Sequence, residues 1–459
     1  MYRFRTVEQL IGEYQELEKQ QIYFAPRNQL NDPMEGMRRY FWQGDKIVWE
    51  NFLKHYILCL EHVIHLSRLM PDDKTITIKD IPIFKSEKDL PTDIYRERIK
   101  KIYKQFFSNN FVQSYMQFII NNPNKIYFQE MYVHLKVLST HAINAIYEID
   151  IQTGILPNKG NNLLEREKVE LNLALDNIWQ DLRPEEYHIL IEIIHGQLKS
   201  WDVVLLIDYK ASPKLQSIHI EFPQMYLDAI VELTYSEAYV ACFMDNCINS
   251  SIWGTYGNNH TGVCLKYKIS NESNPMLALK TIRSLSSAGY SYDFVDFAYK
   301  PMNYSADFNE LDFFGNLGRL SKSQLIEQWY SNENGELSAV CEKMFSRVDE
   351  WRSEYWNAYE QAYLKKLPDW SHENEHRIII ENGIGTYSDK ENRLLEYKFE
   401  SLEAIIFGMK TSIEAKTEII EIIKRKCEET GRNQFDFFEM EYSNRQNKLY
   451  PRKLLSLGE

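Results

Sequence analysis

The segment 365–382 contains two overlapping patterns of residues that could do chemistry. His372, Glu373 and His376 have the spacing HExxH, in which two histidines on one face of a helix bind zinc and the glutamate acts as a base. Glu373 and Glu375 also form a Glu-x-Glu pair, and carboxylates so placed can stabilise positive charge that develops during a reaction. The conformation of the backbone decides between the patterns, because the two chemistries need different geometries.

The residues around this segment favour an extended backbone. In a helix, His372 and His376 lie one turn apart on one face, whereas in a strand they are separated by roughly 13 Å, at about 3.3 Å per residue. Pro368 interrupts the helical pattern that precedes the segment, and the run Ile378–Ile380 is β-branched. We therefore expect a strand over Arg377–Glu381, with the carboxylate pair at its entrance and with no metal.

A zinc hydrolase is the alternative interpretation of the same residues. His372 and His376 would be two of the ligands, Glu373 would be the base, and Glu391 or Glu396 would supply a third ligand from further along the chain. This interpretation requires a helical turn between the two histidines.

The composition is that of a globular protein. The chain has 459 residues, of which 44% are hydrophobic and 26% are charged, and a length of about 150 residues per domain predicts two or three units. The net charge of -13 argues against a protein whose main function is to wrap nucleic acid. Six cysteines in a long chain, no apolar signal core at the N-terminus and no run of 18 apolar residues predict a cytoplasmic protein without a membrane span.

The order of the expected elements indicates an α+β protein with a mixed, mostly antiparallel sheet core that is split by a large all-helical insertion. Residues 1–45 form the first part of the core, residues 46–200 show helical periodicity, and residues 201–459 form the remainder of the core. After the insertion, apolar stretches predict strands at Val203–Ile207, Ser217–Glu221, Ala238–Met244 and Leu402–Phe407.

A loop rich in turn residues precedes a strand that we expect over Gly262–Ile269. The loop contains Trp253, Tyr256 and His260 together with two glycines, so a flat ring could stack there and backbone amides could meet a phosphate. The alternative is that both aromatic residues cap the hydrophobic core, and the sequence leaves the two interpretations open.

The order of short motifs along the chain resembles a large bacterial family that is catalogued as a domain of unknown function. The motifs are YRFR (2–5), IYFAP (22–26), LNDPME (30–35), WGxYxxxHxGVCL (253–265), WSxExExRI (370–378) and AIIFG (404–408). The resemblance covers about residues 1–45 and 230–425 and does not cover the expected insertion. In this family the position of His376 is usually aromatic, which implies that the HExxH spacing is accidental here.

The layout of these motifs also resembles that of ADP-ribosyltransferases. The resemblance implies that Glu375 binds the ribose 2′-hydroxyl of NAD as nicotinamide leaves, and that Glu373 orients or activates the acceptor. It further implies that Arg3 or Arg5 holds the pyrophosphate through a bidentate contact. A carboxylate close to the ribose would stabilise the oxocarbenium-like state through which the bond to nicotinamide breaks.

Under the same resemblance, Trp253 or Tyr256 stacks on the nicotinamide ring, and His260 belongs to the same cofactor-binding loop. NAD would be the substrate, and ADP-ribose would pass to a protein or nucleic-acid acceptor or to water. These expectations describe a bacterial effector or toxin-like enzyme of antiphage defence, with a regulatory partner on the helical insertion. Two other classes stay open, a non-enzymatic ligand- or partner-binding module and the zinc hydrolase.

Overall fold

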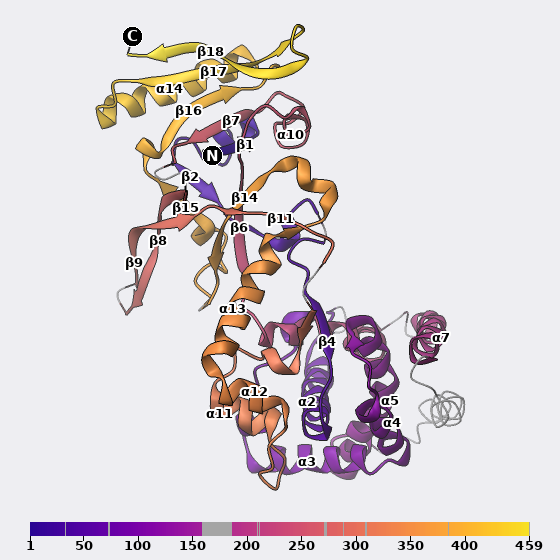
Figure 1. The fold of residues 1–459 in the computed structure, drawn as a ribbon. Coiled ribbons are helices and arrows are strands. Elements are labelled where there is room, and N and C mark those ends of the chain that lie inside the picture. Colours follow the sequence, from indigo (N-terminus) through magenta and orange to yellow (C-terminus); the bar gives the residue numbers. More distant parts are fainter. Residues whose placement is uncertain are drawn as a thin grey trace. The chain divides into compact units, whose positions relative to one another are not determined.

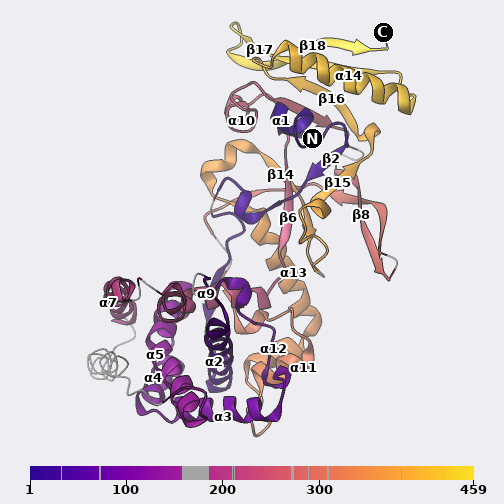
Figure 2. The ribbon, with the colours of Figure 1, turned by 180° about the vertical axis from the view of Figure 1, so that it is seen from behind.

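The computed structural model describes residues 1–32, 34–71, 74–157, 186–208, 210, 212–269, 273–287, 289–307, 310–383 and 385–458. The chain divides into two compact units. Unit 1 contains residues 1–37, 236–308 and 359–459, and unit 2 contains residues 38–235 and 309–358. Figures 1 and 2 show the chain from two opposite sides.

Unit 1 is built on a nine-stranded, mostly antiparallel sheet. Its strands follow the order β10 (Lys300–Pro301), β14 (Glu375–Glu381), β6 (Ala238–Met244), β1 (Tyr2–Arg5), β7 (Val263–Tyr267), β16 (Leu402–Phe407), β17 (Phe435–Ser443) and β18 (Lys448–Leu457), and β3 (Ala25–Pro26) pairs with β6. The strands β16 and β17 run parallel. Helix α14 (Ile413–Thr430) connects these two strands and lies beside them in both views (Figures 1 and 2).

Unit 1 also contains a second sheet, a parallel pair of strands and several short helices. A second, four-stranded sheet consists of β2 (Gln21–Tyr23), β15 (Leu394–Tyr397), β8 (Met276–Ser286) and β9 (Gly289–Ala298). A parallel pair consists of β11 (Asn303–Tyr304) and β13 (Lys365–Lys366). The short helices are α1 (Val7–Ile11), η1 (Arg27–Gln29), α10 (Ser250–Thr255), η9 (Pro368–Glu373), η10 (Glu391–Arg393) and η11 (Phe399–Ser401).

Side chains alternate along the strands of the main sheet and so divide between two hydrophobic cores. Phe243 and Phe437 belong to the core on one face, which also contains Ile419 of α14. Phe4 and Trp253 belong to the core on the other face. Because residues that pair directly across neighbouring strands share a face, the register of β14 fixes the face on which each of its side chains lies.

Unit 2 is mostly helical. Its longer helices are α2 (Lys46–Leu69), α3 (Asp93–Phe107), α4 (Asn110–Asn121), α5 (Phe128–Gln152), α7 (Tyr187–Asp208), α9 (Phe222–Ile230), α12 (Val340–Ser346) and α13 (Val348–Leu364), which contains the boundary after Ala358. Its shorter helical segments are η2 (Ile78–Asp80), η3 (Glu87–Asp89), α8 (Pro213–Gln216), η5 (Ser217–Glu221), η6 (Val231–Leu233), η7 (Phe314–Asn316), α11 (Lys322–Gln324) and η8 (Leu325–Tyr330). A three-stranded sheet has the order β12 (Glu310–Asp312), β4 (Arg39–Trp42) and β5 (Ile126–Tyr127).

The expected mixture of helices with mostly antiparallel sheets is confirmed, and the strands at Ala238–Met244 and Leu402–Phe407 have the expected limits. Two expected strands are wrong. The stretch Val203–Ile207 lies within α7, and Ser217–Glu221 is π-helical between α8 and α9. A short apolar run cannot by itself distinguish a strand from a helix, and in both places the neighbouring turns are helical.

The expected all-helical insertion also needs correction. The stretch 46–200 is not all helical, since its residues Ile126 and Tyr127 form the strand β5. This strand pairs antiparallel with β4 at the edge of the three-stranded sheet. Unit 2 further begins at residue 38, extends to residue 235 and takes in residues 309–358. No helix in the described ranges combines the length and the apolar character that are needed to cross a bilayer.

Candidate functional site

The backbone of the segment 368–381 determines which of the two sequence patterns can form. Pro368–Glu373 form a short 3-10 helix, Asn374 adopts a left-handed conformation with φ of 46°, and β14 starts directly after it. Asparagine tolerates this conformation better than most residues. The strand expected over Arg377–Glu381 is confirmed, and it starts two residues earlier, at Glu375.

The two histidines of the HExxH spacing lie in different elements. The Nδ1 atom of His372, in η9, is 3.0 Å from the carbonyl oxygen of Asp369. His376 lies in β14 and pairs with Phe243. The backbone therefore does not form the helical face that a zinc site of this spacing requires. Across the described ranges, no group of three or more His, Cys, Asp or Glu side chains is placed to hold a metal ion.

Glu373 and Glu375 converge on one ammonium group. The Nζ atom of Lys366, in β13, lies 2.6 Å from Oε2 of Glu373 and 3.1 Å from Oε2 of Glu375. It also lies 2.8 Å from Oε1 of Glu35. Arg377 is 2.6 Å from Oε2 of Glu35 through Nη2 and 2.6 Å from Oε1 of Glu375 through Nε. We call these five residues the charged cluster.

The charged cluster is shielded from solvent and is not balanced in charge. Each of the five side chains is 1% exposed. Three carboxylates face two cations, so one negative charge has no counterpart within the cluster when all five groups are ionised. Because removing ions from water is costly, a surplus charge at this depth is a feature that folding stability alone does not favour.

The pKa values of the two glutamates of the pair shift in opposite directions. Burial opposes the ionisation of Glu375, but the positive charges of Arg377 and Lys366 outweigh it and lower the pKa to about 2. For Glu373, burial outweighs the contact with Lys366 and raises the pKa. Neighbouring carboxyl groups whose environments separate their pKa values can divide the roles of acid and base.

Three half-buried aromatic residues surround the cluster. The hydroxyl of Tyr256 donates a hydrogen bond to Oε1 of Glu373 at 2.8 Å, and the hydroxyl of Tyr304 accepts one from the backbone amide of Glu375 at 2.7 Å. The ring of Trp370 lies 4.6 Å from the lysine ammonium group. Burial raises the pKa of Tyr256, so its hydroxyl stays protonated and remains a donor.

The expected loop around Tyr256 is helical in its first part, since Ser250–Thr255 form α10, and the remainder is bonded within itself. Trp253 is fully buried, donates through Nε1 to the carbonyl oxygen of Cys247 at 2.7 Å, and packs its ring edge-to-face against Phe4. The backbone amides of residues 259–262 each donate to a carbonyl oxygen of residues 253–258. Helix α10 thus places Trp253 in the core, the turn after it uses these amides internally, and Tyr256 reaches the cluster.

Arg3 and Arg5 lie on the other face of the sheet from Glu375. Tyr2 of β1 pairs with Met244 of β6, which in turn pairs with Glu375, so Tyr2 shares the face of this glutamate and the arginines point the other way. Arg3 donates to two backbone carbonyl oxygens, at 3.1 and 3.3 Å. Arg5 is paired with a carboxylate from the loop after α1. The structure does not bring these arginines, or the buried ring of the loop tryptophan, together with the carboxylate pair.

Three members of the cluster were missed by reasoning from the sequence. Glu35 ends the LNDPME motif and Arg377 belongs to the WSxExExRI motif. Their positions in these motifs were therefore the signal from which both residues could have been predicted. Lys366 carried no such signal, since it is one of two adjacent lysines. It lies in β13, which pairs with β11, and its side chain is buried among three carboxylates.

Residues 252–378 match a family model described as Protein of unknown function (DUF2971). The match supports the resemblance to a family of unknown function, and the matched segment contains Tyr256, Lys366, Glu373 and Glu375. Glu35 lies outside it. No curated protein and no solved structure matches the chain.

Proposed function

We propose that unit 1 is an NAD-consuming enzyme that transfers ADP-ribose to a macromolecule or to water. The observation that carries the proposal is the surplus carboxylate of the charged cluster, Glu373, whose pKa is raised beside the ionised Glu375. A buried carboxyl group of this kind is a candidate for proton transfer. The choice of NAD rests on the resemblance of the motif layout to ADP-ribosyltransferases, and an effector of antiphage defence is the setting that the family resemblance implies.

The reaction breaks the bond between the nicotinamide nitrogen and C1′ of the ribose, and nicotinamide leaves with the electron pair. The carboxylate of Glu375 stabilises the positive charge that develops on the ribose. The oxygen of an acceptor hydroxyl or of water bonds to C1′, and its proton passes to the carboxylate of Glu373 and then to solvent. Because Glu373 has to be ionised for this step, the rate rises with pH through its raised pKa.

Substrate has to reach a cluster that is closed in this conformation. The hydroxyl of Tyr256 donates a hydrogen bond to an oxygen of Glu373 at 2.8 Å, and the tyrosine is half-buried in a loop. We assign Tyr256 the role of a gate, because an acceptor hydroxyl that donates to Glu373 would take the place of the tyrosine hydroxyl. Arg3 and Arg5 have no part in this mechanism, since they lie on the opposite face of the sheet.

A second candidate function is a non-enzymatic binding module in which the charged cluster only fastens three segments of unit 1. The full burial of the cluster favours it, and so do the ion pairs by which Lys366 and Arg377 both engage Glu35 and Glu375. In a network of this kind, the neutralisation of Glu373 leaves two carboxylates against two cations. It would therefore tolerate the neutralisation of Glu373 without any loss of function.

Incubation with NAD that carries separate labels in its nicotinamide and adenine halves tests the proposal. We expect the wild-type protein to release nicotinamide and Glu375→Gln to lower that rate by about 100-fold or more, because one electrostatic contact to the reacting ribose is lost. Glu381→Gln is the matched control, since Glu381 is exposed at the end of the same strand, and its rate should stay unchanged. If the wild type releases no nicotinamide with cell extract as a source of acceptors, the binding module is the better account.

A further inference from the structure

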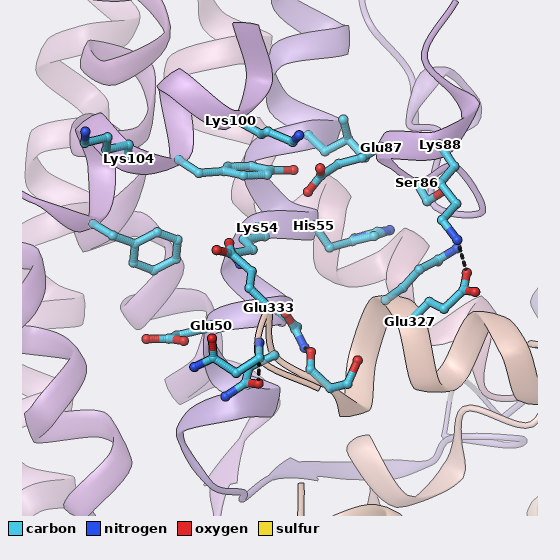
Figure 3. Close-up of a pocket in the computed structure, with 18 of the residues that line it drawn as sticks. Glu50, Lys54, His55, Ser86, Glu87, Lys88, Lys100, Lys104, Glu327 and Glu333 are labelled. Atoms are coloured by element: carbon cyan, nitrogen blue, oxygen red, sulfur yellow. Dashed lines mark hydrogen bonds and ion pairs between the residues drawn. The ribbon is translucent and has the colours of Figure 1, made fainter. Parts of the chain in front are cut away.

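Unit 2 contains a cavity of about 990 Å³ that none of the sequence motifs indicates. Helices α2 and α3, the segment 85–88 and the segment 327–334 line it. Figure 3 shows the side chains around it, with Lys100 and Lys104 on one side and with Lys88 and Glu327 joined by an ion pair on another. Its volume is at the upper end of the range that is usual for small-molecule sites.

The lining of the cavity has an excess of positive charge. It contains six lysines and four glutamates, so two cations are in surplus. Three pairs within the lining neutralise each other, namely Lys46 with Glu50 at 3.5 Å, Lys54 with Glu333 at 3.1 Å, and Lys88 with Glu327 at 2.6 Å. The groups that remain are Lys85, Lys100 and Lys104 against Glu87. Since the whole chain carries a net charge of -13, this surplus is not a consequence of the composition.

The remaining carboxyl group of the lining offsets this surplus only in part, and the buried histidine adds no charge to it. Burial raises the pKa of Glu87. His55 lies between the hydroxyl of Tyr226, at 2.9 Å, and the carbonyl oxygen of Ile83, at 2.8 Å. Burial lowers the pKa of His55 to about 4, so the ring is neutral at pH 7. The field in the cavity is therefore set by the lysines.

Aromatic side chains alternate with lysines on the wall that α3 contributes. Lys100, Tyr103, Lys104 and Phe107 follow each other at spacings of three, one and three residues, which places all four on one face of the helix. Tyr103 is buried and Phe107 is half-buried. An amino group beside an aromatic ring suits a ligand that combines an anionic group with a flat ring.

We propose that this cavity binds a phosphate-bearing compound with a flat ring, the chemical class of the nucleotides. The phosphates contact the lysines of α3 that have no glutamate partner within the lining, namely Lys104 and also Lys100, whose partner Glu97 at 3.1 Å is exposed outside the cavity. The ring packs against Tyr103 and Phe107. This proposal is independent of the reaction assigned to unit 1, because all of its residues belong to unit 2.

Isothermal titration of the full chain with ATP, inorganic tripolyphosphate and adenosine tests this site. We expect ATP to bind more tightly than either of the other two probes, because it alone engages both the lysines and the rings. We expect the double variant Lys100→Glu and Lys104→Glu to weaken ATP binding by about tenfold or more. Higher salt concentration should weaken the binding of ATP and of tripolyphosphate but not that of adenosine.

The matched control is Lys101→Glu. Lys101 is exposed on the same helix but does not line the cavity, so ATP binding should change less than about twofold. Thermal unfolding of each variant shows whether it is folded, and Lys104→Gln provides a milder change if the double variant is not. Three results would overturn the proposal: no binding of ATP at about 1 mM, equal loss of binding in Lys101→Glu, or equal affinity for ATP and tripolyphosphate.

Discussion

The charged cluster of unit 1 and the cavity of unit 2 use lysine in opposite ways. In the cluster, Lys366 is 1% exposed and contacts three carboxylates at distances between 2.6 and 3.1 Å. In the cavity, Lys100 is 57% exposed and its ion-pair partner, Glu97, is 66% exposed and lies outside the lining. The cluster keeps a surplus of negative charge away from water, whereas the cavity presents a surplus of positive charge to it.

This difference shows that burial decides what an ion pair contributes. When one partner of a buried ion pair is removed, the charge of the other partner is left uncompensated in a medium that solvates it poorly. An exposed pair is solvated whether or not it forms, so it contributes little to stability. The cluster should therefore govern the stability of unit 1, and the lysines of the cavity should govern ligand binding.

The largest expected effect is that of Lys366→Met. The substitution leaves three buried carboxylates with Arg377 alone, and we expect it to lower the free energy of unfolding by about 3–5 kcal/mol. Urea unfolding followed by tryptophan fluorescence measures it. The matched control is Lys280→Met, which breaks an exposed pair with Glu396 at 3.2 Å and should cost less than about 1 kcal/mol. Similar losses in the two variants would mean that the cluster does not hold unit 1 together.

Acid should weaken unit 1 through Glu375. The folded-state pKa of about 2 lies below the ordinary value of 4.5, so this carboxylate contributes stability that is complete above the ordinary value and is lost as the pH falls through about 2. The loss is on the order of 3 kcal/mol. The melting temperature measured between pH 6 and about pH 2 should fall less steeply in Glu375→Gln than in the wild type. Parallel curves would show that Glu375 has an ordinary pKa in the folded protein.

Tyr256→Phe should have a smaller effect. The variant loses one hydrogen bond to Glu373 and keeps the ring, which we expect to cost about 1–2 kcal/mol in the free energy of unfolding. Because the gate is then held less firmly, nicotinamide release should not slow. Differential scanning calorimetry and the NAD assay measure the two quantities on the same samples. A rate that falls along with the stability would contradict the role of Tyr256 as a gate.

The smallest expected effect on stability is that of Lys104→Glu in the cavity. Lys104 is exposed, so the free energy of unfolding should stay within about 0.5 kcal/mol of the wild-type value. Thermal unfolding without ligand measures it, and the same variant should bind ATP more weakly. A large loss of stability would mean that this lysine belongs to the packing of unit 2.

Local patterns predicted the elements of the main sheet well. The strands over Ala238–Met244 and Leu402–Phe407 agree with the sequence, since each is a short apolar run bounded by turns, a pattern that is consistent with a buried strand. The strand β14 was predicted because Pro368 and the β-branched run after Arg377 favour an extended backbone, but it starts at Glu375, two residues before the expected limit. The same kind of signal failed at Val203–Ile207, where a helix continues through a short apolar run.

The composition of the charged cluster was less predictable, because it depends on contacts between residues far apart in the chain. The pair Glu373 and Glu375 could be named from its spacing, but Lys366 enters the cluster through the pairing of two very short strands. The faces of Arg3 and Arg5 depend on the register between β1 and β6, which no local pattern specifies. In the sequence, the lysines that line the cavity cannot be distinguished from lysines on a solvated helix face. The distinction needs the packing of α2 beside α3, which the sequence pattern does not specify.

The most direct test of the central claim compares activity and stability in Glu373→Gln. This substitution leaves two carboxylates, those of Glu35 and Glu375, against the two cations Lys366 and Arg377, and glutamine has the shape of a protonated glutamate. We expect nicotinamide release to fall by about 100-fold or more, while the free energy of unfolding changes by less than about 1 kcal/mol. An unchanged rate of nicotinamide release in this folded variant would contradict the claim that the cluster is a reaction centre.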